Sequence, residues 1–169
     1  MIENKIAEFF YKHPSKKPHL RALARACNIS PAAALYATKK LIKKNILKKE
    51  TQKPLTTFTV GKEFTTHKRI WNLEQLYKKK IIEKLKQTRP QAIIVFGSYS
   101  RGEDWEESDI DIAIIKPQKK IDYNKTIQGR VVNILYLNEK IPEELQNNII
   151  NGIPLYGRWD PIFDHSNTI

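Results

Sequence analysis

Two short motifs in the second half of the sequence bring together residue types that can bind a phosphate group and a metal ion. The first is Gly97-Ser98, at the end of an apolar run, and the second is Ser108 followed by Asp109 and Asp111. Alternate residues of a strand face the same way, so the two aspartates share one face and the isoleucines between and after them share the other. Two carboxylates on one face of a buried strand repel each other, and a divalent cation removes that repulsion.

The residues around these aspartates suit a nucleoside triphosphate with bound magnesium. A glycine permits close approach of backbone amides to a phosphate, and the neighbouring serine adds a hydroxyl. Arg101 follows three residues later and can neutralise more of the phosphate charge. Carboxylate oxygens are ligands that Mg²⁺ prefers. We therefore expect nucleotide binding by Gly97, Ser98, Arg101 and Ser108, and Mg²⁺ binding by Asp109 and Asp111.

The segment GSYSRGEDWEESDID resembles the signature of the DNA polymerase β-like nucleotidyltransferase superfamily, and it is most similar to the minimal nucleotidyltransferases of prokaryotes. The similarity spans roughly residues 67–157. It implies a mixed β-sheet with helices packed on one face, which holds Mg²⁺ and a nucleoside triphosphate such as ATP. The implied reaction is attack of an acceptor hydroxyl on the α-phosphate, with release of pyrophosphate. The acceptor is unknown, and the resemblance allows a protein acceptor or a toxin-like partner.

One position departs from the pattern of this superfamily. Active members carry a third carboxylate on a neighbouring strand, and in the matching segment RVVNILYL the third catalytic position is occupied by Asn133. An amide cannot act as a general base near neutral pH, and loss of such a base typically costs about 10²–10⁴-fold in rate. Val131 and Leu135 flank Asn133 on its own face and offer no replacement.

Two interpretations of the site therefore stay open. The domain either transfers a nucleotidyl group or is a degenerate domain that senses nucleotide within a DNA-binding transcriptional regulator. A different strand register, or an acid elsewhere, would restore a third carboxylate. The candidate acids are Glu103, Asp104, Glu106, Glu107 and Asp122.

The first half of the sequence has a different charge and pattern. Residues 1–90 hold 22 basic and 6 acidic side chains, whereas residues 91–169 hold 8 and 12, which favours two modules with different partners. Apolar spacing predicts helices over 2–10, 19–27 and 30–44, followed by strands over 46–50 and 56–60.

The segment HLRALARACNISPAAALYATKKLIKKNILKKE is similar to winged helix-turn-helix domains, and the similarity covers residues 1–62. It implies that the helix over 30–44 enters the major groove of DNA. Lysines on this helix and on the wing suit phosphate contacts, and Tyr36 is the one obvious base-reading candidate. The predicted DNA-binding residues are Ser30, Tyr36, Lys39, Lys40, Lys43, Lys44, Lys48, Lys49 and Lys53. The other interpretation of these lysines is a solvated face on a small helical domain.

The sequence thus predicts an α+β protein. Its expected parts are a winged helix-turn-helix over 1–62, a connector helix over 63–90, a nucleotidyltransferase-like domain over 91–157 and a tail over 158–169. Apolar spacing over 67–87 predicts one long amphipathic connector helix, which is also a candidate element for homodimer formation.

Composition excludes several other classes. No apolar run approaches the roughly 18–20 residues that cross a membrane, so no membrane partner is expected. The single cysteine, Cys27, excludes disulfides within the chain and Cys-rich zinc sites. Charged residues within the first ten positions argue against a signal peptide, and a cytoplasmic location is expected.

Overall fold

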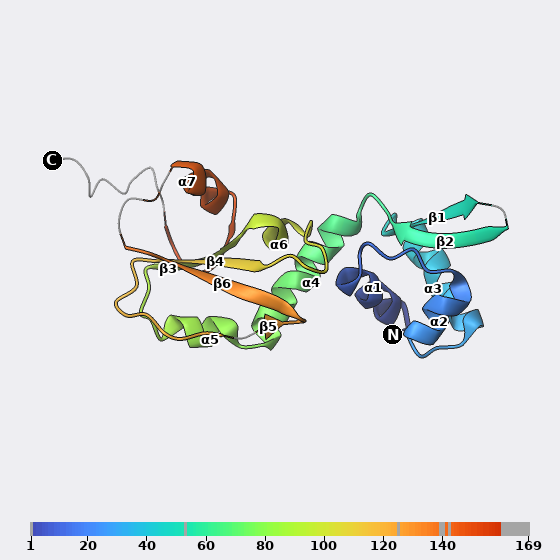
Figure 1. The fold of residues 1–169 in the computed structure, drawn as a ribbon, viewed down its shortest axis with the longest axis horizontal. Coiled ribbons are helices and arrows are strands. Elements are labelled where there is room, and N and C mark those ends of the chain that lie inside the picture. Colours follow the sequence, from blue (N-terminus) through green and yellow to red (C-terminus); the bar gives the residue numbers. More distant parts are fainter. Residues whose placement is uncertain (1, 53, 125, 139–140, 142, 160–169) are drawn as a thin grey trace. The chain divides into compact units, whose positions relative to one another are not determined.

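The computed structural model describes residues 2–52, 54–124, 126–138, 141 and 143–159 (Figure 1). Predicted DNA contact Lys53 and the part of the predicted tail from residue 160 onward lie outside this range. The chain divides into two compact units, Met1–Trp71 and Asn72–Ile169. Within the described residues, none of the helices is both long enough and apolar enough to cross a membrane.

The first unit consists of three helices followed by a two-stranded antiparallel ribbon (Figure 1). These elements are α1 (Ile2–Lys12), α2 (Leu20–Ala26), α3 (Pro31–Lys43), β1 (Leu47–Gln52) and β2 (Leu55–Val60). All three helices and the ribbon contribute to one apolar core. Its buried members include Ile6, Phe10, Leu23, Leu41 and Phe58.

The bounds of α3 follow from the residues at its two ends. Ser30 is the N-cap, and its Oγ accepts a hydrogen bond from the Ala33 amide at 3.2 Å, with Pro31 in the first turn. Just after the C-terminal end, Asn45 takes a left-handed conformation with φ of 56°, which asparagine tolerates well. Both ends lie where the sequence predicted them.

The ribbon is joined to the helices by backbone pairing. His19 forms an antiparallel bridge with Thr57, and the Phe58 amide donates to the Pro18 carbonyl at 3.0 Å. The segment before α2 therefore adds a short third strand to the wing. Three helices followed by a wing that pairs in this way are the winged helix-turn-helix arrangement, and this part of the fold prediction is confirmed.

The connector is two helices rather than the one long helix that was predicted. α4 (Phe64–Lys78) ends before Lys80, and α5 (Ile81–Lys86) begins after it. Lys80 has a φ of 53°, so the chain turns there. Apolar spacing continues through this break because Ile81 and Leu85 are buried in α5. The spacing of apolar residues alone therefore could not predict the break.

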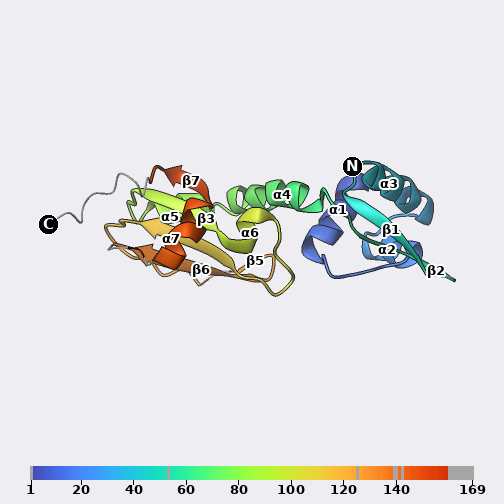
Figure 2. The same ribbon diagram turned by 90° about the horizontal axis from the view of Figure 1, so that it is seen from above.

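The second unit is built on a five-stranded mixed sheet with the order β5-β6-β4-β3-β7. Figure 2 shows β7 beside β3 at one edge of this sheet. Only β4 and β6 are parallel, and the other neighbouring strands are antiparallel. The strands are β3 (Ala92–Phe96), β4 (Ile110–Ile115), β5 (Thr126–Ile127), β6 (Arg130–Leu137) and β7 (Ile153–Gly157).

Helices cover both faces of this sheet, which corrects the expectation of one covered face. Ile93 and Ile112 face a core with α5, whereas Ile94 and Ala113 face a second core. Ile149 of α7 (Glu143–Ile150) lies in that second core, and Figure 1 shows α5 and α7 on opposite sides of the strands. The physical reason is that β3 and β4 are buried on both faces, so each face needs a cover.

Candidate functional site

The predicted catalytic residues lie at one end of three neighbouring strands. β3 ends at Phe96, which pairs with Asp111 near the start of β4, and Asp111 in turn pairs with Asn133 near the start of β6. The turn after β3 and the beginnings of β4 and β6 therefore meet at the same end of the sheet. Alternation places Asp111 and Asn133 on the face covered farther along by α7, opposite the buried Ile110 and Ile112.

The side chains of the three predicted catalytic residues are in direct contact. Asn133 Nδ2 donates a hydrogen bond to Asp109 Oδ2 at 3.0 Å and a longer one to Asp111 Oδ1 at 3.4 Å. Asp109 and Asn133 are exposed, and Asp111 is half-buried. The amide thus lies against both carboxylates and offsets part of their repulsion through its N–H groups, without adding a charge.

Gly97 is required at the turn beside these carboxylates. It begins α6 (Gly97–Arg101) with a φ of 71°, a conformation that residues with a Cβ rarely adopt. A Cβ at this position would lie 2.9 Å from Asp111 Oδ2. The turn backbone therefore lies close to the Asp111 carboxylate, with the half-buried Ser98 as the next residue.

Two of the predicted phosphate ligands have other contacts within their own loop. Arg101 Nε is 2.6 Å from Glu103 Oε2 in an exposed ion pair. Ser108 Oγ accepts a hydrogen bond from the Trp105 amide at 2.9 Å and closes a turn before β4. Phosphate binding by Arg101 would have to break its contact with Glu103, whereas Ser108 already has a structural role.

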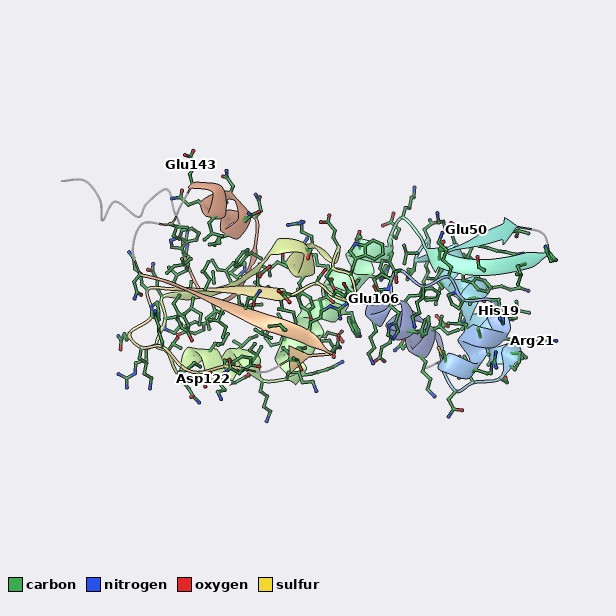
Figure 3. All side chains as sticks on the ribbon, in the orientation of Figure 1. His19, Arg21, Glu50, Glu106, Asp122 and Glu143 are labelled. Carbon is green, nitrogen blue, oxygen red and sulfur yellow. The ribbon has the colours of Figure 1, made fainter. Side chains whose placement is uncertain are left out.

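Two of the loop acids considered as substitutes for the third carboxylate have specific partners. Glu103 pairs with Arg101, and Asp104 is buried with its Oδ2 at 3.0 Å from Arg130 Nη2. Asp122 lies in the loop before β5 and is labelled in Figure 3. Across the described ranges, no group of three or more His, Cys, Asp and Glu side chains is placed to hold a metal ion.

A buried polar network beside the site was not predicted from the sequence. Asn72 Nδ2 donates to Asp104 Oδ1 at 2.7 Å and to the Tyr99 carbonyl at 2.9 Å. Tyr99 in turn donates its hydroxyl to the Asn72 carbonyl at 3.2 Å. Burial and the nearby Asp104 carboxylate raise the pKa of Tyr99 above its ordinary value. No periodicity or local motif indicates this network, because Asn72 lies 27 residues from Tyr99 and 32 residues from Asp104 along the chain.

Arg130 extends the network to the strand that carries Asn133. Its Nε and Nη2 donate to the Trp105 carbonyl at 3.2 and 3.0 Å, in addition to the ion pair with Asp104. The loop before Asp109 is consequently attached to the first residue of β6. This attachment fixes the ends of the two strands whose side chains form the site.

Several predicted DNA contacts on the first unit are paired with acids. Lys40 Nζ is 2.7 Å from one oxygen of Glu3, and Lys44 Nζ is 3.5 Å from the other. Lys48 Nζ lies 3.0 Å from Glu50 Oε1 on the wing. The hydrogen bond from Lys40 lowers the pKa of Glu3, and the hydrogen bond from Lys48 lowers the pKa of Glu50.

The other predicted DNA contacts lie on the surface of α3 and the wing. Tyr36 is 62% exposed, and Lys40 Nζ lies 4.6 Å from the centre of its ring. The Ser30 hydroxyl is engaged as the helix cap. The remaining lysines, Lys39, Lys43 and Lys49, have exposed side chains. The predicted lysines of the described residues thus fall into two groups. Lys39, Lys43 and Lys49 are exposed, whereas Lys40, Lys44 and Lys48 are paired with carboxylates.

Comparisons with known proteins give a match to one family model and weak likenesses to solved structures. None of the curated proteins matches the chain. The solved structure of the adhesin competence repressor AdcR from Streptococcus pyogenes is similar at 21% identity and a TM-score of 0.40, over 50% of this chain and 64% of that one. A solved structure of a point mutant of ZitR from Lactococcus lactis is similar at 15% identity and a TM-score of 0.40, over 49% and 59%.

The chain therefore spans less than two thirds of the length of these solved structures.

The family described as Polymerase beta, Nucleotidyltransferase matches residues 79–160, a range that contains Gly97, Asp109, Asp111 and Asn133. Over these residues the second unit of the chain is thus similar to a nucleotidyltransferase domain of the polymerase β type.

Proposed function

We propose that this chain is a DNA-binding regulator whose nucleotidyltransferase domain binds a magnesium-nucleoside triphosphate but has lost efficient transfer. The observation that carries the proposal is the position of Asn133, whose amide lies between the carboxylates of Asp109 and Asp111. The two carboxylates support metal-nucleotide binding, and the amide supports the loss of transfer.

The residues present fit a bound magnesium ion and a triphosphate. Asp109 and Asp111 offer the carboxylate oxygens that Mg²⁺ prefers, and both contact Asn133 Nδ2. The turn that begins at Gly97 lies beside Asp111, and its backbone amides and the Ser98 hydroxyl would hold phosphate oxygens. When bound, the metal would supply neutralisation of phosphate charge and polarisation of the α-phosphate.

Transfer further requires a group that accepts the proton of the attacking hydroxyl. Asn133 occupies the position of that base, and its amide does not accept a proton near neutral pH. The side chain would still orient the aspartates through its hydrogen bonds to both of them. Binding without turnover is the expected behaviour of this set of residues.

The second candidate function is an active nucleotidyltransferase. It is supported by the intact turn at Gly97 and by the contact of that turn with Asp111. In this case the acceptor itself, or a partner protein such as a toxin-like chain, would bring the missing base into the site.

Nucleotide binding and label transfer separate these two functions. We expect ATP with Mg²⁺ to raise the melting temperature of the wild-type protein, and Asp111→Ala to abolish that shift. A matched control is Glu83→Ala, which removes an exposed acid from α5 on the opposite face of the sheet and should leave the shift unchanged.

Transfer is measured with labelled ATP and candidate acceptors, including the protein itself, RNA and a partner chain. Binding without transfer by the wild type, together with transfer by Asn133→Asp, supports the regulator. Transfer by the wild type that is abolished in Asp109→Ala supports the enzyme. If neither ATP nor Mg²⁺ shifts the melting temperature, both proposals for this site are wrong.

DNA binding by the first unit is the other half of the proposed function. It is supported by the winged helix-turn-helix arrangement and by the 14 basic against 3 acidic side chains in residues 1–62. We expect the affinity for duplex DNA to fall steeply as salt is raised from 50 to about 300 mM, because bound phosphates release counterions. Fluorescence anisotropy with a labelled duplex checks this. A complex that is insensitive to salt, or none at 50 mM, would contradict DNA binding.

A further inference from the structure

A pocket on the first unit contains basic side chains that the sequence pattern did not single out. Its volume is about 530 Å³, and it lies between α2 and the beginning of α3. Its lining residues are His19, Arg21, Ala24, Arg25, Ile29 and Pro31. Figure 3 shows His19 and Arg21 at the start of α2. The pocket therefore combines two guanidinium groups and an imidazole with apolar carbon from three other residues.

The local structure places these basic groups together. Arg21 and Arg25 are four residues apart on α2 and so lie on one face of the helix. His19 is the N-cap of α2, and its Nδ1 accepts a hydrogen bond from the Ala22 amide at 3.3 Å. A neutral imidazole that accepts at Nδ1 carries its hydrogen on Nε2, so a second donor is available at this end of the pocket.

These arginines differ from several lysines of the same unit in what they already contact. Within the described part of the chain, neither Arg21 nor Arg25 has an ion pair or a side-chain hydrogen bond. By contrast, Glu3 or Glu50 holds each of the lysines Lys17, Lys40, Lys44 and Lys48. A phosphate that approaches one of these lysines meets a neighbouring carboxylate, whereas no ion pair with an acid is found for either arginine within the described residues.

The chemistry of the pocket suits a phosphate diester. A guanidinium presents a planar pair of N–H donors that matches two phosphate oxygens. The N-terminus of α3, whose first turn begins at Pro31, adds a positive partial charge from its dipole. The half-buried side chain of Ile29 offers an apolar surface for a sugar rather than for a second charge.

We propose that this pocket binds a backbone phosphate of DNA beside the N-terminus of α3, with Arg21 and Arg25 as its charged contacts and His19 as a further donor. The proposal rests on the DNA-binding part of the proposed function and assigns the residues that carry it. DNA is favoured over a small anion because residues 1–62 carry a formal charge of +11, far more than one phosphate requires.

The test compares two substitutions that remove the same net charge from the first unit. Arg21→Gln and Arg25→Gln each lower the net charge by one. The control Lys5→Gln also lowers it by one, and it removes an exposed lysine of α1 that does not line the pocket and is not a predicted DNA contact. Affinity for a labelled duplex is measured across a salt series for all variants, with circular dichroism and melting temperature to check folding.

We expect each arginine variant to bind DNA on the order of tenfold more weakly at 100 mM salt, as for loss of a charged hydrogen bond. The slope of log affinity against log salt should become shallower by about one for a lost phosphate contact. Lys5→Gln should change affinity by no more than about twofold, because salt screens an exposed charge that contacts no phosphate. Arg25→Lys should retain part of the affinity, because it keeps the charge but loses the paired donors.

The opposite pattern would overturn the assignment and leave DNA binding in place. That pattern is wild-type affinity and slope in both arginine variants, together with weakened binding in Lys5→Gln. If the wild type binds no DNA, the proposed function and the phosphate assignment both fail. A rise in melting temperature with inorganic phosphate that depends on Arg21, without DNA binding, would make the pocket a small-anion site and reject DNA as its ligand.

Discussion

At the scale of single residues, the geometry of the site depends on one buried ion pair. Asp104 and Arg130 form an ion pair whose side chains are 0% and 1% exposed. A buried pair of this kind contributes little net stability against an apolar alternative, yet removal of one partner leaves the other charge buried and alone. The pair matters here because it holds the loop before Asp109 against β6.

Asp104→Asn should therefore destabilise the protein strongly, by about 3–5 kcal/mol, because Arg130 loses its buried counter-charge. Urea unfolding followed by tryptophan fluorescence measures the change. The matched control is Glu103→Gln, which removes an acid from the exposed pair with Arg101 and should cost less than about 1 kcal/mol. Equal effects of the two substitutions would show that the buried pair does not anchor the loop.

Residues with a local signal were predicted well, and residues with long-range partners were not. The Ser30 cap and the shared face of Asp109 and Asp111 follow from neighbours in sequence, and the structure has both. The contact of Asp104 with Arg130 joins positions 26 residues apart and has no local pattern. For the same reason, the sequence could not predict that Lys40 forms an ion pair with Glu3, nor that Arg21 has no ion pair within the described residues.

At the scale of elements, the long helices and the apolar strands were predictable, and the breaks and short strands were not. β5 has two residues and β7 has five, so neither is long enough for alternation to be distinguished from chance. The break between α4 and α5 depends on one left-handed residue, Lys80. Lysine has no particular preference for that conformation, so its position gave no sign of a break.

Lys80→Gly should stabilise the protein by about 0.5 kcal/mol. Glycine adopts a φ of 53° without the roughly 1–2 kcal/mol penalty of other residues, and this gain exceeds the entropy that glycine adds to the unfolded chain. The control is Lys84→Gly inside α5, which removes the same charge and should destabilise by about 1 kcal/mol. Chemical denaturation compares the two variants, and a loss of stability in Lys80→Gly would contradict the assigned turn.

At the scale of the whole molecule, the change of charge along the chain corresponds to two structural units. The basic residues 1–62 form the winged helix-turn-helix, and the acidic second half contains the sheet with Asp109 and Asp111. The boundary between the units falls at Trp71 within α4, so this helix supplies side chains to two cores. Phe64 and Trp71 pack in the first core, and Leu76 is buried in the second.

A helix shared in this way has a consequence for how the chain can be divided. A fragment that stopped at residue 62 would lose Phe64, which is 4% exposed, and also Trp71, whose ring centre lies 5.3 Å from that of Tyr11. Such a fragment would have a hole in its core, whereas one that continued to Lys78 would keep the helix whole. Proteolysis within α4 would for the same reason loosen both units at once, so the stability of each unit depends on the intact helix.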